Sequence, residues 1–296
     1  MLKALGHLGL WAGLYALAAF ICFSQLAGLT RAGLLPQWEA MACVLLTATA
    51  VYSIDRVKMF SAWLDPADIE AQPERYKFLS RQPVRVRSFA VALLIAAAIA
   101  GARIHSFLPI LVVIAAASTV VYAPKPRRRF ARVKDRLWLK NAYVAIGMTA
   151  FSALIAIAAA YPGTLEQMAQ SAWTERAAIL TSFITVTLRI LFDAALCDID
   201  DEPTDRRFRT ETFATSLGTL RVWNWAGIGR IAIAAGLFLA RPLPFVTRVS
   251  WSIAMILGMI ALRWRHPTRI RDTVDFRFLP EAVFVTVILF FWKRSS

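Results

Sequence analysis

Two clusters of acidic residues, far apart in the sequence, are the strongest sign of chemistry in this chain. The first includes Asp55 and Asp68, and the second includes Asp198, Asp201 and Asp205. The i, i+3, i+7 spacing of the second cluster would place its carboxylates on one face of a continuous helix. Carboxylates held so close repel one another unless a cation neutralises them. Because Mg²⁺ takes oxygen ligands and often bridges carboxylates to phosphates, the pattern favours a Mg²⁺ site for a phosphorylated substrate.

A plainer interpretation of the second cluster stays open. Its acids also balance the basic residues that follow them on a solvated loop, which are Arg206, Arg207 and Arg209. Pro203 lies between Asp201 and Asp205, and proline lacks the N–H that a helix interior needs. We therefore expect the helix to break there, so that only Asp198 and Asp201 securely share a face.

Long apolar blocks flank both clusters and indicate the class of protein. Hydrophobic residues make up 58% of the 296 residues, and the mean hydropathy is +0.55. A hydrocarbon core of about 30 Å is crossed by about 20 helical residues. We therefore expect an all-α polytopic membrane protein with about nine transmembrane helices. The expected spans are 7–29, 38–55, 88–104, 106–123, 141–160, 173–197, 221–240, 242–262 and 277–293.

The net charge of +15 follows the expected membrane topology. Lys and Arg collect in the cytoplasmic loops of membrane proteins. Here most of the 34 basic residues lie in alternate loops, at 56–87, 124–140, 198–220 and 263–276. We therefore expect one integral domain over 1–296 in the cell inner (plasma) membrane, with a cytoplasmic amino terminus. Because the basic residues alternate loop by loop, no nucleic-acid partner is expected.

The stretch from Asp198 to Gly218 resembles the second aspartate motif of the UbiA-type intramembrane prenyltransferase family. In that family a DxxDxxxD-R run is followed by a turn containing Thr and ends in Leu-Gly. The matching residues here are Asp198, Asp201, Asp205, Arg206, Thr212, Leu217 and Gly218. The first loop resembles the family's other motif at Asp55-Arg56 and again from Asp68 to Arg75. The nine-helix layout is similar along the whole chain.

The first aspartate motif diverges from the family pattern. The usual form is Asn-x-x-x-Asp-x-x-x-Asp, and this chain has Val51, Asp55 and Met59 at those places. Asp68 replaces the third acid only if the loop folds back. The Gly-Lys that usually follows the second motif is replaced by Arg209-Thr210. These departures concern the activity or the usual substrate and not the fold.

The resemblance implies a Mg²⁺-dependent transfer of an isoprenyl group from a prenyl diphosphate to a hydrophobic, often aromatic, acceptor among membrane lipids. It implies that Asp198 and Asp201 are the catalytic pair. The implied metal ligands are Asp55, Asp68, Asp198, Asp201 and Asp205, and the implied diphosphate-binding residues are Arg56, Arg75, Lys125 and Arg206. Departure of the diphosphate would leave an allylic carbocation, which aromatic faces stabilise by cation–π attraction.

Other interpretations of the intramembrane charges stay open. Asp193 either positions the acceptor or pairs with Arg189 at a spacing of i, i+4. The whole chain could instead be a non-catalytic UbiA-like protein that binds lipid or a partner. A small transporter is a further alternative, since charges inside membranes mark ion pathways. The absence of a repeat between the two halves, and acids placed at helix ends, disfavour a transporter.

Overall fold

The computed structural model describes residues 6–30, 35–58, 69–70, 72–122, 137–161, 172–264 and 270–295, and its elements there are helices. The helices are α2 (Leu10–Leu26), α3 (Trp38–Val57), α5 (Pro73–Ser80), α6 (Pro83–Ala102), α7 (Leu108–Tyr122), α8 (Leu137–Ala160), α10 (Trp173–Phe208), α11 (Phe213–Leu217), α12 (Thr219–Leu239), α13 (Phe245–Trp264) and α14 (Ile270–Ser295). The chain is therefore an all-α protein over these residues.

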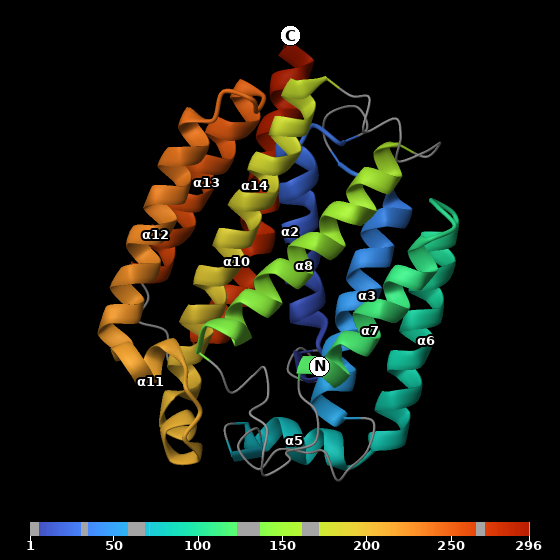
Figure 1. Cartoon of the computed structure of the whole chain (residues 1–296), viewed down its shortest axis with the longest axis vertical. Coiled ribbons are helices and arrows are strands. Elements are labelled where there is room, and N and C mark those ends of the chain that lie inside the picture. Colours follow the sequence, from blue (N-terminus) through green and yellow to red (C-terminus); the bar gives the residue numbers. More distant parts are fainter. Residues whose placement is uncertain are drawn as a thin grey trace.

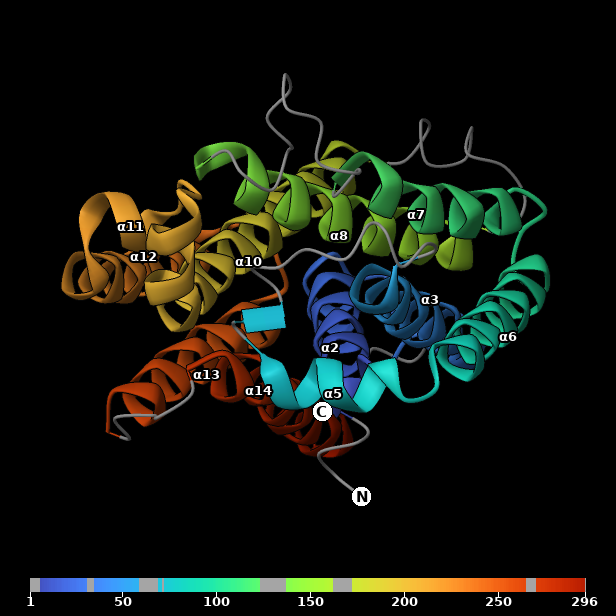
Figure 2. The ribbon, with the colours of Figure 1, turned by 90° about the horizontal axis from the view of Figure 1, so that it is seen from below.

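Helix α2 lies in the middle of the bundle, where it contacts α3, α8, α10, α13 and α14 (Figures 1 and 2). Its sequence is apolar on all sides and rich in alanine, so neighbouring helices approach it closely from every direction. Phe20, Phe23 and Leu26 are fully buried there. The remaining long helices surround α2 and α3, and many of their outer residues are exposed apolar side chains, as expected for a bundle that faces lipid.

Each of the nine expected spans coincides with a helix, and the prediction of a polytopic membrane protein is confirmed. Six helices of the described part are long and apolar enough to cross a membrane: Trp38–Val57, Pro83–Ala102, Leu139–Ala160, Trp173–Phe208, Thr219–Leu239 and Phe245–Arg263. Leu10–Leu26 and Leu108–Thr119 are shorter apolar helices. The count of nine crossings therefore stays a prediction.

The short helices α5 and α11 lie at one end of the bundle, together with the first turn of α2, and the last turn of α14 lies at the other end (Figure 1). Helix α5 runs across this end and not along the bundle axis. Pro73 begins α5 and Pro83 begins α6, where a missing N–H costs nothing. Two of the loops that the charge pattern assigns to the same membrane face, 56–87 and 198–220, thus meet at one end.

Helix α10 runs to Phe208 without the break expected at Pro203, so that prediction is wrong. A proline removes only one backbone hydrogen-bond donor from a helix. Two backbone hydrogen bonds, donated by the N–H groups of Arg209 and Thr210, close the turn that follows Pro203. Arg209, with φ of 57°, ends the helix in the left-handed region, and the N–H of Thr210 donates to the carbonyl of Asp205 at 2.8 Å. All acids of the second cluster therefore lie on one continuous helix.

Several charged side chains meet inside the bundle and join α2, α10, α12 and α14. We call this group the core ion cluster; its members are Tyr15, Arg189, Asp193, Arg230, Arg277 and Glu281, all buried. Asp193 accepts hydrogen bonds from Tyr15 (2.8 Å), Arg277 (3.1 Å) and Arg230. Arg189 pairs with Glu281 at 2.6 Å and lies 3.8 Å from Asp193. The pairing of Arg189 with Asp193 is therefore present, as one contact of a larger network.

The core ion cluster corrects one argument of the sequence analysis. Intramembrane acids were expected only at helix ends, but Glu281 lies well inside α14 and is buried. Burying a charge in an apolar interior is costly unless a partner compensates it. Glu281 and Asp193 therefore depend on the arginines around them, and these arginines depend on the two acids. The cluster makes the packing of four helices interdependent.

Helix α13 approaches the core ion cluster at Gly258, which gives a test of how tightly the cluster is packed. A Cβ at Gly258 would overlap the carboxylate of Glu281 and lie 3.2 Å from Cδ of Arg277. Because ion pairs hold both side chains, we expect Gly258→Ala to lower the stability by about 1–3 kcal/mol. Thermal unfolding in detergent measures the loss.

Gly236 of α12 is the matched control, because a Cβ there has no atom within 4 Å. Gly236→Ala should keep or raise the unfolding temperature, since alanine forms helices better than glycine. Equal losses in the two variants would contradict the close packing around Glu281.

Candidate functional site

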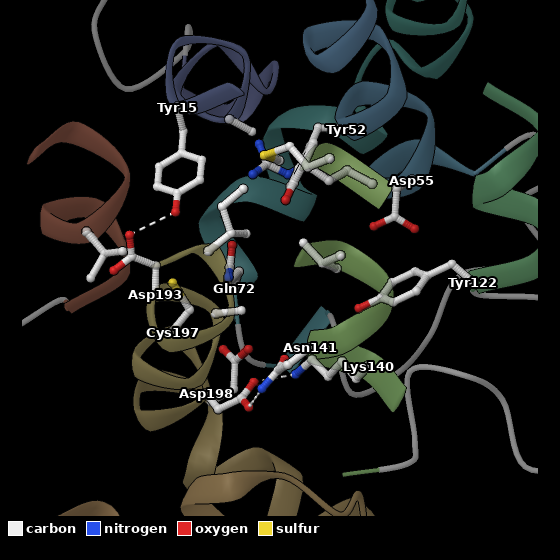
Figure 3. Close-up of a pocket in the computed structure, with 18 of the residues that line it drawn as sticks. Tyr15, Tyr52, Asp55, Gln72, Tyr122, Lys140, Asn141, Asp193, Cys197 and Asp198 are labelled. Atoms are coloured by element: carbon white, nitrogen blue, oxygen red, sulfur yellow. Dashed lines mark hydrogen bonds and ion pairs between the residues drawn. The ribbon is translucent and has the colours of Figure 1, made fainter. Parts of the chain in front are cut away.

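A cavity of about 210 Å³ lies inside the bundle, at the end that α5 covers. Helices α3 and α5 contribute Asp55, Arg56 and Arg75 to its lining, and a second wall comes from α8 and α10. The charged and amide residues of that second wall are Lys140, Asn141, Asp198 and Asp201. Figure 3 shows the labelled members of both walls around the same space. Segments far apart in the sequence therefore place opposite charges around one cavity.

The structure brings together five of the residues that the sequence analysis singled out. Asp55, Arg56, Arg75, Asp198 and Asp201 all line the cavity. Their convergence follows from the topology, because α3 and α10 both end at the same end of the bundle. The roles of these residues as ligands stay predictions.

The other predicted site residues are placed differently. Asp205 is buried on α10 but is not part of the cavity lining. Arg206 is exposed and pairs with Glu202 one turn earlier on the same helix. Asp68 and Lys125 lie outside the described residues. The neighbouring acid Asp200 accepts from the N–H of Ile270 at 3.1 Å and so caps the start of α14, which is a structural role.

Asp198 is held by two consecutive residues of α8. It is 1% exposed, and its two oxygens accept from Nζ of Lys140 at 2.6 Å and from Nδ2 of Asn141 at 2.9 Å. The sequence analysis counted Lys140 only among the basic residues of a loop and did not predict Asn141. Because α8 begins at Leu137, both side chains project from its first turns toward α10. Residue spacing alone gave no sign of this contact.

Asp55 is also paired with a lysine. Lys58 ends α3 with φ of 56°, a conformation that is costly for a residue with a side chain, and its ammonium pairs with Asp55. The carbonyl of Lys58 accepts from Nε of Arg87 at 2.9 Å, and the backbone N–H of Lys58 donates to the carbonyl of Ile54 at 2.7 Å. These bonds fix the strained end of α3 beside the cavity.

Arg56 links the cavity wall to the amino-terminal segment. Its Nη1 donates to the carbonyls of Gly6 at 2.7 Å and His7 at 3.4 Å, and its guanidinium lies 5.6 Å from the ring centroid of Tyr52. The side chain is buried, so it is held in one place. Arg56 therefore contributes a fixed positive charge to this wall of the cavity.

The lining of the cavity also includes apolar and aromatic side chains. Val144, Met148 and Ile190 line it, and the hydroxyl of Tyr15 donates to Asp193 at the boundary with the core ion cluster. Two further tyrosines, Tyr52 and Tyr122, also line the cavity. The site therefore has a charged part beside an apolar, aromatic part.

The donor set of the cavity fits a divalent cation that is shared with a phosphate. Mg²⁺ is usually held by one or two carboxylates together with water and substrate phosphates. Asp55, Asp198 and Asp201 supply carboxylates, and a carboxylate has about four lone-pair sites, so two hydrogen bonds leave Asp198 with acceptor capacity. Within the described ranges, no group of three acidic, histidine or cysteine side chains is placed to form a metal site by itself.

Comparison with solved structures identifies the fold. The chain is similar to a UbiA homolog from Aeropyrum pernix K1, with a TM-score of 0.64 and 14% identity over 94% of this chain and 97% of that one. It is also similar to a digeranylgeranylglyceryl phosphate synthase, with a TM-score of 0.51 and 14% identity over 100% of both chains. No protein-family model and no curated protein matches the chain. The expected UbiA-type fold is therefore confirmed.

Access to the cavity can be tested with its own cysteine. Cys197 lines the cavity, whereas Cys22 and Cys43 are buried elsewhere, and none of the three forms a disulfide. We expect a small water-soluble thiol reagent to modify Cys197 at least about tenfold faster than the two buried thiols, because a thiol reacts only where the reagent reaches it. Mass spectrometry of peptides from the folded protein measures the rates. Faster modification of Cys22 or Cys43 would show that the cavity is closed to water.

Proposed function

We propose that this chain, which has the UbiA-type fold, transfers an isoprenyl group from a prenyl diphosphate to a hydrophobic or aromatic acceptor in the membrane, with Mg²⁺ as cofactor. One observation carries the proposal: acidic residues of both motifs (Asp55, Asp198 and Asp201) and three basic residues (Arg56, Arg75 and Lys140) line a single cavity together with apolar and aromatic side chains. A ligand with a strongly charged head and an apolar chain suits this combination. The names of the two similar structures support the same class of reaction.

The proposed reaction breaks the bond between C1 of the isoprenyl chain and a diphosphate oxygen, which keeps the electron pair. The allylic carbocation that remains forms a new bond with a nucleophilic carbon or oxygen of the acceptor. The acceptor loses a proton to solvent, and the diphosphate leaves. The protein must therefore stabilise negative charge at the leaving group and positive charge on the isoprenyl chain.

The charged part of the cavity suits the leaving group. Three positive charges line the cavity, those of Arg56, Arg75 and Lys140. Positive charges that are already in place stabilise the negative charge that develops on the leaving diphosphate. We assign one Mg²⁺ to Asp198 and Asp201 and a second to Asp55, each completed by oxygens of the diphosphate, whose charge the two cations would neutralise. Asp205, Asp68, Lys125 and Arg206 stay predicted ligands, since they do not line the cavity or lie outside the described residues.

The aromatic side chains of the cavity lining suit the carbocation. Tyr15, Tyr52 and Tyr122 offer aromatic rings, whose faces attract a cation. Asp193 fixes the Tyr15 hydroxyl and is itself held by arginines of the core ion cluster, so the ring has a defined position. The apolar residues around the rings exclude water, which would otherwise capture the cation.

The orientation in the membrane is part of the proposal. We assign the end that carries α5, α11 and the amino terminus to the cytoplasm, and the membrane to the plasma membrane. The support is the alternation of basic loops in the sequence, together with the described basic residues at this end, such as Arg75 and Lys77 on α5, which is typical of cytoplasmic faces. Water-soluble prenyl diphosphates would then reach the cavity from the cytoplasm.

A non-catalytic lipid-binding protein is the second candidate function. Val51 stands where the family has an asparagine, and the two lysine pairs already neutralise Asp55 and Asp198 without a metal. In this case the same cavity would bind a lipid phosphate without breaking a bond. Binding of a prenyl diphosphate with no transfer to any acceptor in a broad panel would favour this candidate.

Binding of an isoprenyl thiodiphosphate, measured by calorimetry in detergent with and without Mg²⁺, tests the proposed function. We expect measurable binding without metal that Mg²⁺ tightens at least about tenfold, and a loss of this Mg²⁺-dependent gain in Asp198→Asn, because a charged ligand to the cation is lost. Glu175→Gln is the matched control on the same helix: Glu175 lies in the first turn of α10 and does not line the cavity, so binding should be unchanged. Failure of the thiodiphosphate to bind under either condition would contradict the proposal.

A further inference from the structure

Lys140 occupies one of the carboxylate oxygens at which a metal would bind. Its Nζ lies 2.6 Å from Oδ1 of Asp198, and, like Asn141, it is a partner of Asp198 that sequence spacing did not reveal. An ammonium ion and a divalent cation cannot share this position, because their like charges repel at contact distance. Asp198 keeps open lone pairs, but the charge of the Lys140 ammonium opposes a metal on them until Lys140 leaves.

The two partners of Asp198 differ in their freedom to move. Asn141 is buried and uncharged, and its side chain is short, so its amide stays hydrogen-bonded to Oδ2 of Asp198. The Lys140 side chain is 19% exposed, lines the cavity and carries its charge on a flexible four-carbon chain. Lys140 is therefore the partner that can turn away from Asp198 toward a ligand in the cavity.

A diphosphate in the cavity would supply the alternative partner. Its oxygens carry more negative charge than one carboxylate, and lysine binds phosphates as a point charge. Movement of Lys140 to the diphosphate would uncover Oδ1 of Asp198 at the same time that phosphate oxygens become available to the metal. Without a diphosphate, departure of Lys140 would leave Asp198 as an uncompensated charge inside the bundle, which is costly.

We propose that Lys140 makes metal binding at Asp198 conditional on the diphosphate: it neutralises Asp198 in the empty site and moves to the diphosphate when the substrate binds. The proposal rests on the proposed function and adds Lys140 to the site as the residue that couples the two ligands. Asn141 keeps Asp198 in the same orientation in both states. The empty site then has a weak affinity for divalent cations, and the metal and the prenyl diphosphate bind together.

The first arm of the test measures the metal alone. Mn²⁺ replaces Mg²⁺, and electron paramagnetic resonance of the free ion gives its affinity for the purified chain in detergent. We expect weak binding to the unmodified protein and at least about tenfold tighter binding to Lys140→Met, because the competing ammonium is removed. Lys140→Arg keeps a competing charge and should bind Mn²⁺ as weakly as the unmodified protein.

Lys77→Met controls for the general loss of a positive charge, since Lys77 is exposed on α5 at the same end of the bundle. Its Mn²⁺ affinity should change by less than about twofold, as expected for a solvent-screened charge. Lys140→Gln replaces Lys140→Met if the latter fails to fold, with the same expected direction. Unchanged or weaker Mn²⁺ binding in both uncharged variants would overturn the proposal.

The second arm measures the isoprenyl thiodiphosphate without metal. Lys140→Met should weaken this binding at least about tenfold relative to the unmodified protein, since the charge that contacts the diphosphate is lost. An unchanged affinity would overturn the movement of Lys140. The first arm needs no prenyl ligand, so it separates the two proposals. Tight Mn²⁺ binding by the unmodified protein alone would disprove the coupling while leaving prenyl transfer standing.

Discussion

Neutralising carboxylates inside an apolar bundle is the constraint that links the fold of this chain to its site. The interior acids have cationic partners on other helices: Asp193 has Arg230 and Arg277, Glu281 has Arg189, and Asp198 has Lys140. These pairs connect α8, α10, α12 and α14 across the bundle. Because a buried charge is costly without its partner, packing of the helices and charge at the cavity depend on one another.

The fold was largely predictable, since it follows from the length of the apolar segments in the sequence. Long apolar blocks separated by basic loops gave the helices, and comparison with solved structures confirms the UbiA-type arrangement. The error concerned Pro203, where local propensity predicted a break. The turn after Pro203 is closed by backbone bonds at Arg209 and Thr210, so the helix survives the loss of one donor. These backbone hydrogen bonds depend on the residues after Pro203, so the helical propensity of proline alone does not predict them.

The site was predictable only where charge spacing carried information. Asp55, Arg75 and Asp198 were recognised from two motifs, and they do line one cavity. Lys140 and Asn141 were not predicted. Packing between helices decides the direction in which the first turns of α8 project their side chains, and residue spacing does not reveal that packing. In the sequence, a basic residue at the start of a helix is explained equally well by membrane topology as by a role in the site. The divergence at Met59, where the family pattern has its third acidic residue, leaves the first motif with fewer acids, and the lysine pairs show how Asp55 and Asp198 are balanced.

A structure of the chain in lipid nanodiscs with an isoprenyl thiodiphosphate and Mg²⁺ would show whether this cavity is the prenyl diphosphate site. We expect the thiodiphosphate to lie between Arg75 of α5 and Lys140 of α8, with Mg²⁺ against the carboxylates of α3 and α10. We also expect the isoprenyl chain to lie along Met148 and Ile190. A ligand bound on the outer surface, with this cavity empty, would show that the cavity is not the prenyl diphosphate site.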